Sequence, residues 1–337
     1  MTKYYRAIPM TDPARPASAL PIAGGWCWFD RVEVLSRGKA AEIIPVTEAP
    51  QSVLHAIASP RGDIAGLSMA APQVMGILNV TPDSFSDGGR YIDPERALTQ
   101  AQTMIREGAT IIDVGGESTR PGAAAVPVEE ETARVAQVVE ALAQAGVCVS
   151  IDTRKALVAA KTAELGAKIL NDVSAMSYDP AMAEVAVSAG LPICLMHAQG
   201  TPETMQADPR YDDVVLDVYD YLAERIKVAI SAGIKRSQII VDPGIGFGKT
   251  QHHNLALLRR LSIFHSLGCP ILLGAAVNVS LVKYLVRRML PKGWLDRSLS
   301  RLMVFAKGCR SCECMILCRP DRPLACRLHC LGHFNDS

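Results

Sequence analysis

Short apolar runs alternate with longer amphipathic segments along most of the chain, beginning at Val74. The apolar runs lack a helical period and have strand length, whereas the segments between them have the period and length of helices. Seven strands are predicted in this way: 74–80, 111–114, 147–151, 169–173, 193–196, 239–241 and 271–273. The helices predicted between them cover 94–107, 128–145, 155–165, 180–188, 212–232 and 254–267. Such tandem β-α units predict a parallel (β/α)8 TIM barrel, and an open doubly wound sheet is the alternative.

The segments before and after these β-α units lack the alternation of apolar runs and amphipathic segments. Residues 1–73 are punctuated by proline and glycine, with strand-like runs at 32–35 and 43–46 and a possible helix at 51–58. They contain no catalytic constellation, so we interpret them as a covering N-terminal extension. The regular pattern ends near residue 275. We therefore expect three parts: an extension (1–73), a barrel (74–275) and a C-terminal segment (276–337) that replaces the last barrel units.

Polar side chains stand where the apolar runs end. In a parallel barrel the carboxyl ends of all strands meet at one mouth, where binding and catalytic residues lie. Carboxylates or amides at the ends of five strands are too many for unpaired core residues, since a buried polar group is costly without a partner. Asp113 and Asp172 can also be structural, as loop caps or as partners of Arg120 and Arg154. The residues at this predicted mouth are Asn79, Asp113, Asp152, Asn171, Asp172, Met196, His197 and Asp242.

Composition narrows the range of functions. The 337 residues are 49% hydrophobic and 20% charged, which is enough for one large domain or two small ones. The formal net charge of +1 gives no reason to expect a nucleic-acid partner. No apolar run approaches the roughly 20 residues needed to cross a bilayer, so no membrane partner is expected. The N-terminal residues lack an apolar signal core, and four of the ten cysteines are scattered as in cytosolic proteins, so we expect a cytoplasmic protein.

The residue types at the mouth suit a particular chemistry. Asp152, Asn171 and Asp242 supply acceptors and an amide donor, which fits a flat heterocycle with amino and ring N–H groups, such as a pterin or purine. Asn79 is a candidate ligand for Mg²⁺ beside diphosphate oxygens. Thr119 and Arg120 in a turn suit phosphate oxygens.

Two further features near the mouth are weaker signals. The glycine-rich stretch DPGIGFGK, with Lys249, lets backbone N–H groups approach a ligand but lacks the Walker spacing. A lone histidine at a strand end is more often a structural donor than an acid or base, and His197 is interpreted so.

Several segments of the chain resemble the signature segments of the dihydropteroate synthase family. They are GILNVTPDSFSDGG, DVGGESTRPGA, IDTRK, NDVSAM, LMHAQGTPETMQ and DPGIGFGKT, in the family's order between about Val74 and Gly274. The resemblance implies a (β/α)8 barrel, usually a homodimer, that acts in folate biosynthesis. It implies that 6-hydroxymethyl-7,8-dihydropterin diphosphate condenses with 4-aminobenzoate, releasing diphosphate with the help of Mg²⁺.

The resemblance also implies roles for individual residues. Asn79 is expected at the Mg²⁺, and Phe85 at the 4-aminobenzoate site where sulfonamides compete. Arg120 and Asp152 are the expected catalytic residues, Arg120 through the leaving group and Asp152 through the pterin. The expected substrate-binding residues are Thr119, Asp152, Asn171, Met196, Asp242, Phe247 and Phe85.

The resemblance stops after Gly274. The family's Ser-Arg-Lys and Arg-Val-His-Asp segments are absent, and a cysteine-rich tail follows. When the codons are read one base earlier, residues 276–283 can encode Ser-Arg-Lys-Arg-Phe-Ile-Gly-Glu, and 313–316 can encode Arg-Val-His-Asp. The hypothesis is a one-base deletion near codon 275 or 276. The alternative is a zinc module, whose ligands would come from Cys309, Cys312, Cys314, Cys318, Cys326, Cys330, His329 and His333, although their spacing matches no standard paired knuckle.

A damaged C-terminus has physical consequences. Without an eighth strand, the strands at Val74 and Ile271 would each have an unpaired edge, unless 281–285 or 303–305 fills the gap. The missing lysine, arginine and histidine also remove cations that would face the diphosphate. We therefore expect marginal stability and low synthase activity. Two other functions remain open: a pterin-binding methyltransferase of the corrinoid kind, and a catalytically inactive pterin-binding barrel.

Overall fold

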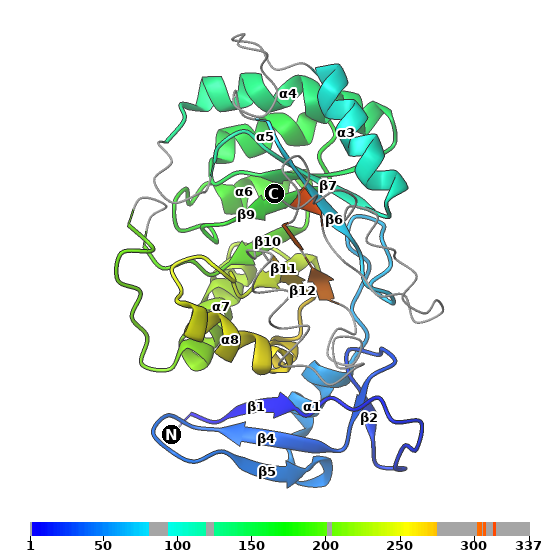
Figure 1. Ribbon diagram of the computed structural model, residues 1–337, viewed down its shortest axis with the longest axis vertical. Helices are drawn as coiled ribbons and strands as arrows, with labels where there is room; N and C mark the ends of the chain where they lie inside the picture. The colour runs from blue at the N-terminus through cyan, green and yellow to red at the C-terminus, as the bar shows by residue number, and fades with distance from the viewer. Residues whose placement is uncertain are drawn as a thin grey trace, which may run out of the picture.

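The computed structural model describes residues 2–80, 94–118, 125–200 and 204–274, and the backbone of 302–304, 306–307 and 313–314. A curled sheet with helices packed around it forms most of this structure, and a small antiparallel unit lies at one end (Figure 1). Among the described residues, none of the helices has the length and apolar character needed to cross a membrane.

Seven consecutive parallel strands form the sheet, each paired with the next in sequence order. The α/β barrel architecture is confirmed, and each of the seven strands lies within a residue or two of its expected bounds. They are β6 (Met75–Asn79), β7 (Ile111–Gly115), β8 (Cys148–Asp152), β9 (Ile169–Asp172), β10 (Ile193–Met196), β11 (Ile239–Asp242) and β12 (Ile271–Leu273).

Helices connect the strands and cover the outside of the sheet (Figure 1). The single helix expected over 254–267 is wrong. Thr250 caps a helix that begins at Gln251, because its side chain accepts from the backbone N–H of His253 in a capping box. Arg260 leaves helical geometry, and a 3₁₀ segment follows. The elements are α3 (Pro94–Arg106), α4 (Val128–Gln144), α5 (Ala156–Glu164), α6 (Met182–Ala189), α7 (Val214–Ser231), η2 (Arg236–Gln238), α8 (Gln251–Arg259) and η3 (Leu261–Leu267).

Both edges of this seven-stranded sheet are paired, which is the alternative that the sequence left open to unpaired edges. β13 (Leu302–Val304) lies parallel to β12, close to the segment 303–305 considered as a filler. β15 (Glu313–Cys314) pairs antiparallel with β6, and β14 (Ala306–Lys307) pairs with β15. The physical reason is that edge N–H and C=O groups can pair with almost any extended backbone, whatever side chains it carries.

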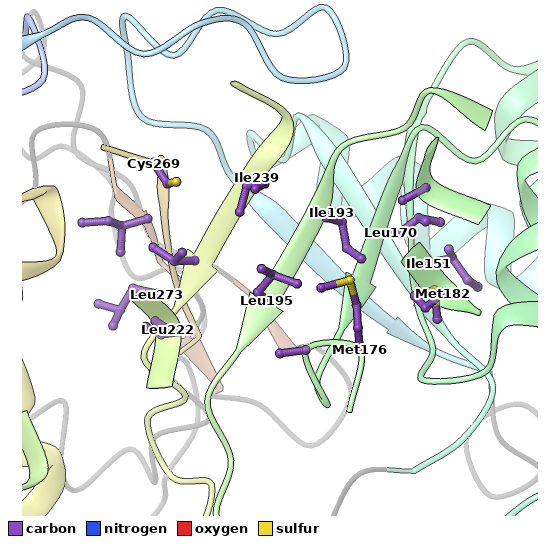
Figure 2. Close-up of a cluster of buried hydrophobic side chains, with 14 of the residues drawn as sticks. Ile151, Leu170, Met176, Met182, Ile193, Leu195, Leu222, Ile239, Cys269 and Leu273 are labelled. Atoms are coloured by element: carbon purple, nitrogen blue, oxygen red, sulfur yellow. The ribbon is translucent and has the colours of Figure 1, made fainter. Parts of the chain in front are cut away.

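The side chains of each strand alternate between the outer and the inner face of the sheet. Outward side chains pack on the helices: Ile151, Leu170, Leu195 and Leu273 form one apolar layer with Leu222 of α7 (Figure 2). Inward side chains near the amino ends of the strands form a second cluster, which the segment before β6 closes with Ile64 and Met69. The strand residues of this inner cluster include Met75, Ile111, Ile169, Ile240 and Leu272. The lumen is therefore apolar at its floor.

The N-terminal unit has a sheet and an apolar core of its own. It docks on the outside of the barrel: Tyr4 Oη donates to Asp220 of α7 at 2.8 Å, and Ser262 of η3 donates to the carbonyl of Ala7 at 2.8 Å. The first strand was not expected from the sequence. The elements are β1 (Tyr4–Ala7), β2 (Leu20–Pro21), β3 (Trp28–Phe29), β4 (Arg31–Leu35), β5 (Glu42–Pro45), η1 (Val46–Glu48) and α1 (Gln51–Ala58).

Candidate active site in the barrel mouth

The carboxyl ends of the strands make the upper lumen polar. In β8, Val149 and Ile151 pack on the helix side, so Ser150 and Asp152 face inward. The same alternation applies to its neighbours, and the sheet register aligns Asn79 with Gly115, Gly115 with Asp152, and Asp152 with Asn171. Asp242 of β11 is the register partner of Met196 on the adjacent strand β10. Predicted residues from five strands thus share one lumen.

Gly115 leaves room between two of these side chains. A Cβ at this position would lie 3.6 Å from Asn79 Oδ1 and 3.5 Å from Asp152 Oδ2, so both oxygens border the same small space. Oxygen donors of this kind are the ligands that Mg²⁺ prefers. The residues present therefore fit a magnesium ion bound through few protein ligands. Among the described residues, no group of three or more His, Cys, Asp or Glu side chains could hold a metal.

Burial gives the carboxylates of the lumen unusual acid–base properties. It raises the pKa of Asp242 to about 7, against an ordinary value of 3.8. Burial also raises the pKa of Asp152 well above its ordinary value, and the charge of nearby Asp113 raises it further. A carboxylate that is held out of water in this way gains most from a ligand that donates N–H groups. The lumen is chemically suited to a ring with several donors.

Asp172 has a structural role as a loop cap, which the sequence left open beside a role as a partner of an arginine. Its side chain accepts from the backbone N–H groups of Ser174 and Met176 at 2.8 and 2.6 Å, and from the Ser174 hydroxyl at 2.6 Å. Ala175 and Met176 both adopt positive φ in this turn. Asp172 therefore caps the loop after β9, and this loop contributes Val173, Ser174 and Ser177 to the cavity described below.

The glycine-rich loop after β11 is held from inside by Lys249. This buried side chain donates to the carbonyl oxygens of Gly244, Phe247 and His197 at 2.8, 2.9 and 3.2 Å. Burial lowers the pKa of Lys249 to about 7. The sequence suggested that Lys249 stands beside a ligand, but the structure places it beneath its own loop. The Gly244 N–H donates to Asp242 Oδ1 at 2.7 Å and ties the loop to the strand end.

His197 is structural, although not as the donor expected. Its Nδ1 lies 2.9 Å from Lys249 Nζ and accepts from the ammonium group. Burial and the charge of Lys249 lower the pKa of His197 to about 3. The ring also meets Tyr221 edge-on, with centroids 4.9 Å apart. A neutral histidine in this environment is suited to packing rather than to proton transfer.

A buried ion network supports the strand ends of β7 and β8. Glu117 binds Arg154 through two contacts of 3.0 and 3.2 Å and lies 3.2 Å from Lys155. Lys155 also pairs with Glu131 of α4, which accepts from Thr153 at 2.6 Å. Burial alone would raise the pKa of Glu117, but Arg154, the Val126 N–H and Lys155 outweigh it and lower the pKa. Arg154 is thus held by Glu117, and not by Asp113 or Asp172.

A cavity of about 220 Å³ opens beside this network. The guanidinium carbon of Arg154 lies 4.3 Å from the centre of the Tyr178 ring, so cation and ring together form one wall. Met196 and Phe247, which were expected near the pterin, are also in the lining. The full lining is Glu117, Ser118, Arg154, Val173, Ser174, Ser177, Tyr178, Met196, Ala198, Gly200, Met205, Tyr221 and Phe247.

Five of the nine residues expected in the site stand at strand ends around the lumen: Asn79, Asp152, Asn171, Met196 and Asp242. A sixth, Phe247, lines the neighbouring cavity with Met196. The remaining three, Phe85, Thr119 and Arg120, lie outside the described residues. Sequence reasoning missed Glu117, Glu131, Lys155 and Tyr178. Glu117 stands inside GGESTRPG and Lys155 inside IDTRK. Their positions next to motif residues were the signal that could have identified them. Nothing in the sequence pairs Glu131 with either segment.

Comparisons with known proteins agree with this geometry. A family model described as a pterin binding enzyme matches residues 75–310. The dihydropteroate synthase of Escherichia coli K12 is 53% identical over 209 residues, covering 62% of this chain and 74% of the relative. That of Bacillus subtilis is 50% identical over 204 residues, covering 60% and 69%.

Solved structures extend the similarity to three dimensions. A Yersinia pestis dihydropteroate synthase in complex with a sulfonamide drug has a TM-score of 0.61 and 46% identity, over 67% of this chain and 83% of that one. A Xanthomonas albilineans dihydropteroate synthase with 4-aminobenzoic acid has a TM-score of 0.62 and 41% identity, over 72% and 91%. Another structure of the Xanthomonas protein is in complex with 7,8-dihydropteroate.

Proposed function

We propose a function from one premise: the chain belongs to the pterin-binding enzyme family. The proposed reaction is that of a dihydropteroate synthase, a transferase of folate biosynthesis. It condenses 6-hydroxymethyl-7,8-dihydropterin diphosphate with 4-aminobenzoate to give 7,8-dihydropteroate and diphosphate. The observation that carries the proposal is the convergence of Asn79, Asp152, Asn171 and Asp242 on one polar lumen.

In this proposal the lumen holds the pterin. Asp152 and Asp242 accept hydrogen bonds from its amino and ring N–H groups, and the ligand's donors favour the ionised carboxylates that burial opposes. Asn171 supplies an amide at the same depth, while Met196 and Phe247 pack nearby. Thr119 and Arg120 are proposed at the diphosphate, and Phe85 at the 4-aminobenzoate. These three assignments rest on the sequence motifs alone.

The bond that breaks joins the pterin methylene carbon to the diphosphate oxygen. Electrons of the pterin ring support positive charge at that carbon, and the amine of 4-aminobenzoate then forms the new C–N bond. Arg120 is proposed to stabilise charge on the leaving diphosphate. Asn79 is proposed to hold Mg²⁺, which would neutralise further charge on the same group. No protein nucleophile is required, so the protein's contribution is to bind, orient and stabilise charge.

The altered C-terminus points to low turnover of this particular chain. The Ser-Arg-Lys and Arg-Val-His-Asp segments that the family resemblance leads one to expect are absent after Gly274. A one-base deletion near codon 275 is proposed as the cause, and a C-terminal segment from 276 onward that replaces the last barrel units is proposed as the result. On this basis an inactive pterin-binding barrel is the second candidate function. We also propose that the protein is a homodimer in the cytoplasm. The proposed parts of the chain are the extension (1–73), the barrel (74–275) and the C-terminal segment (276–337).

Binding and turnover are to be measured separately on the purified chain. Calorimetry with the pterin diphosphate should detect binding that Asp152→Asn removes, whereas Asp208→Asn, an exposed carboxylate paired with Arg210, should bind normally. A coupled assay should find little dihydropteroate formation, and restoring the reading frame should increase it. Failure of the unaltered chain to bind pterin would contradict the proposed function. Normal turnover of the chain, or a nucleotide sequence without Ser-Arg-Lys in any phase, would refute the proposed impairment.

A further inference from the structure

Asp113 faces the lumen one layer below the mouth. Its neighbours Ile112 and Val114 pack on the helix side of β7, whereas Ile111 belongs to the inner cluster, so the carboxylate points inward with Ile111. Asp113 is 2% exposed. Its register partner on β8 is Ser150, which faces the same lumen. The mechanism above does not use either side chain.

The Asp113 carboxylate contacts a residue of the proposed pterin site. Asn171 Nδ2 donates to Asp113 Oδ2 at 3.0 Å in a buried environment. This bond fixes the orientation of the amide while Asp113 is ionised, because an ionised carboxylate can accept from the nitrogen but cannot donate to the oxygen. The nitrogen of Asn171 is turned towards β7, which leaves its carbonyl oxygen for a different partner. Without Asp113, the amide could rotate and present a donor instead.

We propose that Asp113 is a positioning residue that holds Asn171 with its side-chain oxygen directed to N–H donors of the bound heterocycle. The inference rests on the proposed function and extends it by one residue outside the ligand-contacting set. It also assigns the polarity of the Asn171 contact: Asn171 accepts from the ring at that position. A ligand with an acceptor at the corresponding atom would be rejected, because both groups would then lack a donor.

Ser150 supports the Asp113 carboxylate from the neighbouring strand. Its hydroxyl is a side-chain hydrogen-bond partner that lowers the pKa of Asp113, as Asn171 does. Both Asp113 and Ser150 face the lumen above the apolar floor formed by Ile111 and its neighbours. The carboxylate that orients Asn171 is therefore itself held by a residue of β8.

Two variants of the full chain separate orientation from charge. Asp113→Leu removes the acceptor and the charge, and should weaken pterin diphosphate binding about tenfold at pH 8, since Asn171 loses a buried partner. Asp113→Asn keeps an acceptor oxygen and should lose less at pH 8. Equal affinity of Asp113→Leu and the unaltered chain would overturn the inference.

A measurement without ligand keeps this test separate from the proposed function. Burial raises the pKa of Asp113 to about 6, and Asn171 and Ser150 counteract part of the rise. The ¹⁵N-detected side-chain amide signals of Asn171, assigned by their loss in Asn171→Asp, should therefore titrate near pH 6. The titration should vanish in Asp113→Asn. Signals that do not respond to pH would overturn the inference even if pterin binds, while failure of the unaltered chain to bind pterin would refute the proposed function alone.

Discussion

The approach of Gly244 to His197 allows a sharp test of how the glycine-rich loop is built. A Cβ at Gly244 would lie 1.9 Å from the backbone oxygen of His197. Real Cβ atoms keep at least 3.0 Å, so one backbone segment must move by about 1 Å or more. Gly244 also has φ of +65°, which costs an L-residue roughly 1–2 kcal/mol. With overpacking of about 1–3 kcal/mol, Gly244→Ala should destabilise the protein by about 3 kcal/mol.

Gly246 provides the matched control in the same loop. Its φ is +90°, but a Cβ there would meet nothing within 4 Å. Gly246→Ala therefore has the backbone strain without the clash, and should cost about 1–2 kcal/mol. Urea denaturation followed by circular dichroism measures both values. Pterin binding should also fall in Gly244→Ala, since the loop end is tied to Asp242 by the Gly244 N–H. Unfolding free energies of the two variants within about 0.5 kcal/mol of each other would refute this reasoning.

Three further outcomes are expected from the buried charges. Burial raises the pKa of Asp242 to about 7, so the folded state binds more protons than the unfolded state between pH 4 and 7. The unfolding free energy should therefore decrease as the pH rises through this range, and Asp242→Asn should make this decrease smaller. Glu117→Gln should lower the unfolding free energy by about 3 kcal/mol by leaving a buried cation poorly paired, whereas Glu130→Gln, at an exposed pair, should change it by less than about 0.5 kcal/mol. Lys249→Met should lower the urea midpoint and leave three carbonyls without their donor, whereas Lys227→Met, 74% exposed, should leave the midpoint unchanged. Equal effects in either matched pair would contradict the assignment of the buried member.

The periodicity of the sequence was sufficient for the barrel and for most of the mouth. Strand runs such as 193–196 and 271–273 have the same bounds in the structure, because short apolar runs between helical segments have few other solutions. Polar residues at strand ends likewise place Asp152, Asn171 and Asp242 on one rim by topology alone. The helix expected over 254–267 was wrong because its start depends on a side-chain cap at Thr250, which competes with hydrophobic periodicity.

The roles of the charged residues depended on three-dimensional contacts. The sequence suggested that Lys249 stands beside a ligand and that His197 is structural, and the structure pairs the two side chains with each other beneath the glycine-rich loop. Burial decides this, since an ammonium group in the interior requires nearby acceptors and the loop carbonyls are the ones within reach. Similarly, Glu117 and Glu131 look like ordinary acidic residues until they are seen to share Lys155.

The residues at the strand ends follow from the amino-acid order alone, because a strand's period of two and the tandem β-α order leave one mouth for them all. The sequence also carried the family signatures that lead to a pterin. The partners of these residues became known from the folded chain: Asn171 is held by Asp113, Gly115 leaves space between Asn79 and Asp152, and β15 near residue 313 pairs with β6. Hydrogen bonds and buried charges depend on distances of a few ångströms between segments far apart in the chain, and linear order does not encode these distances.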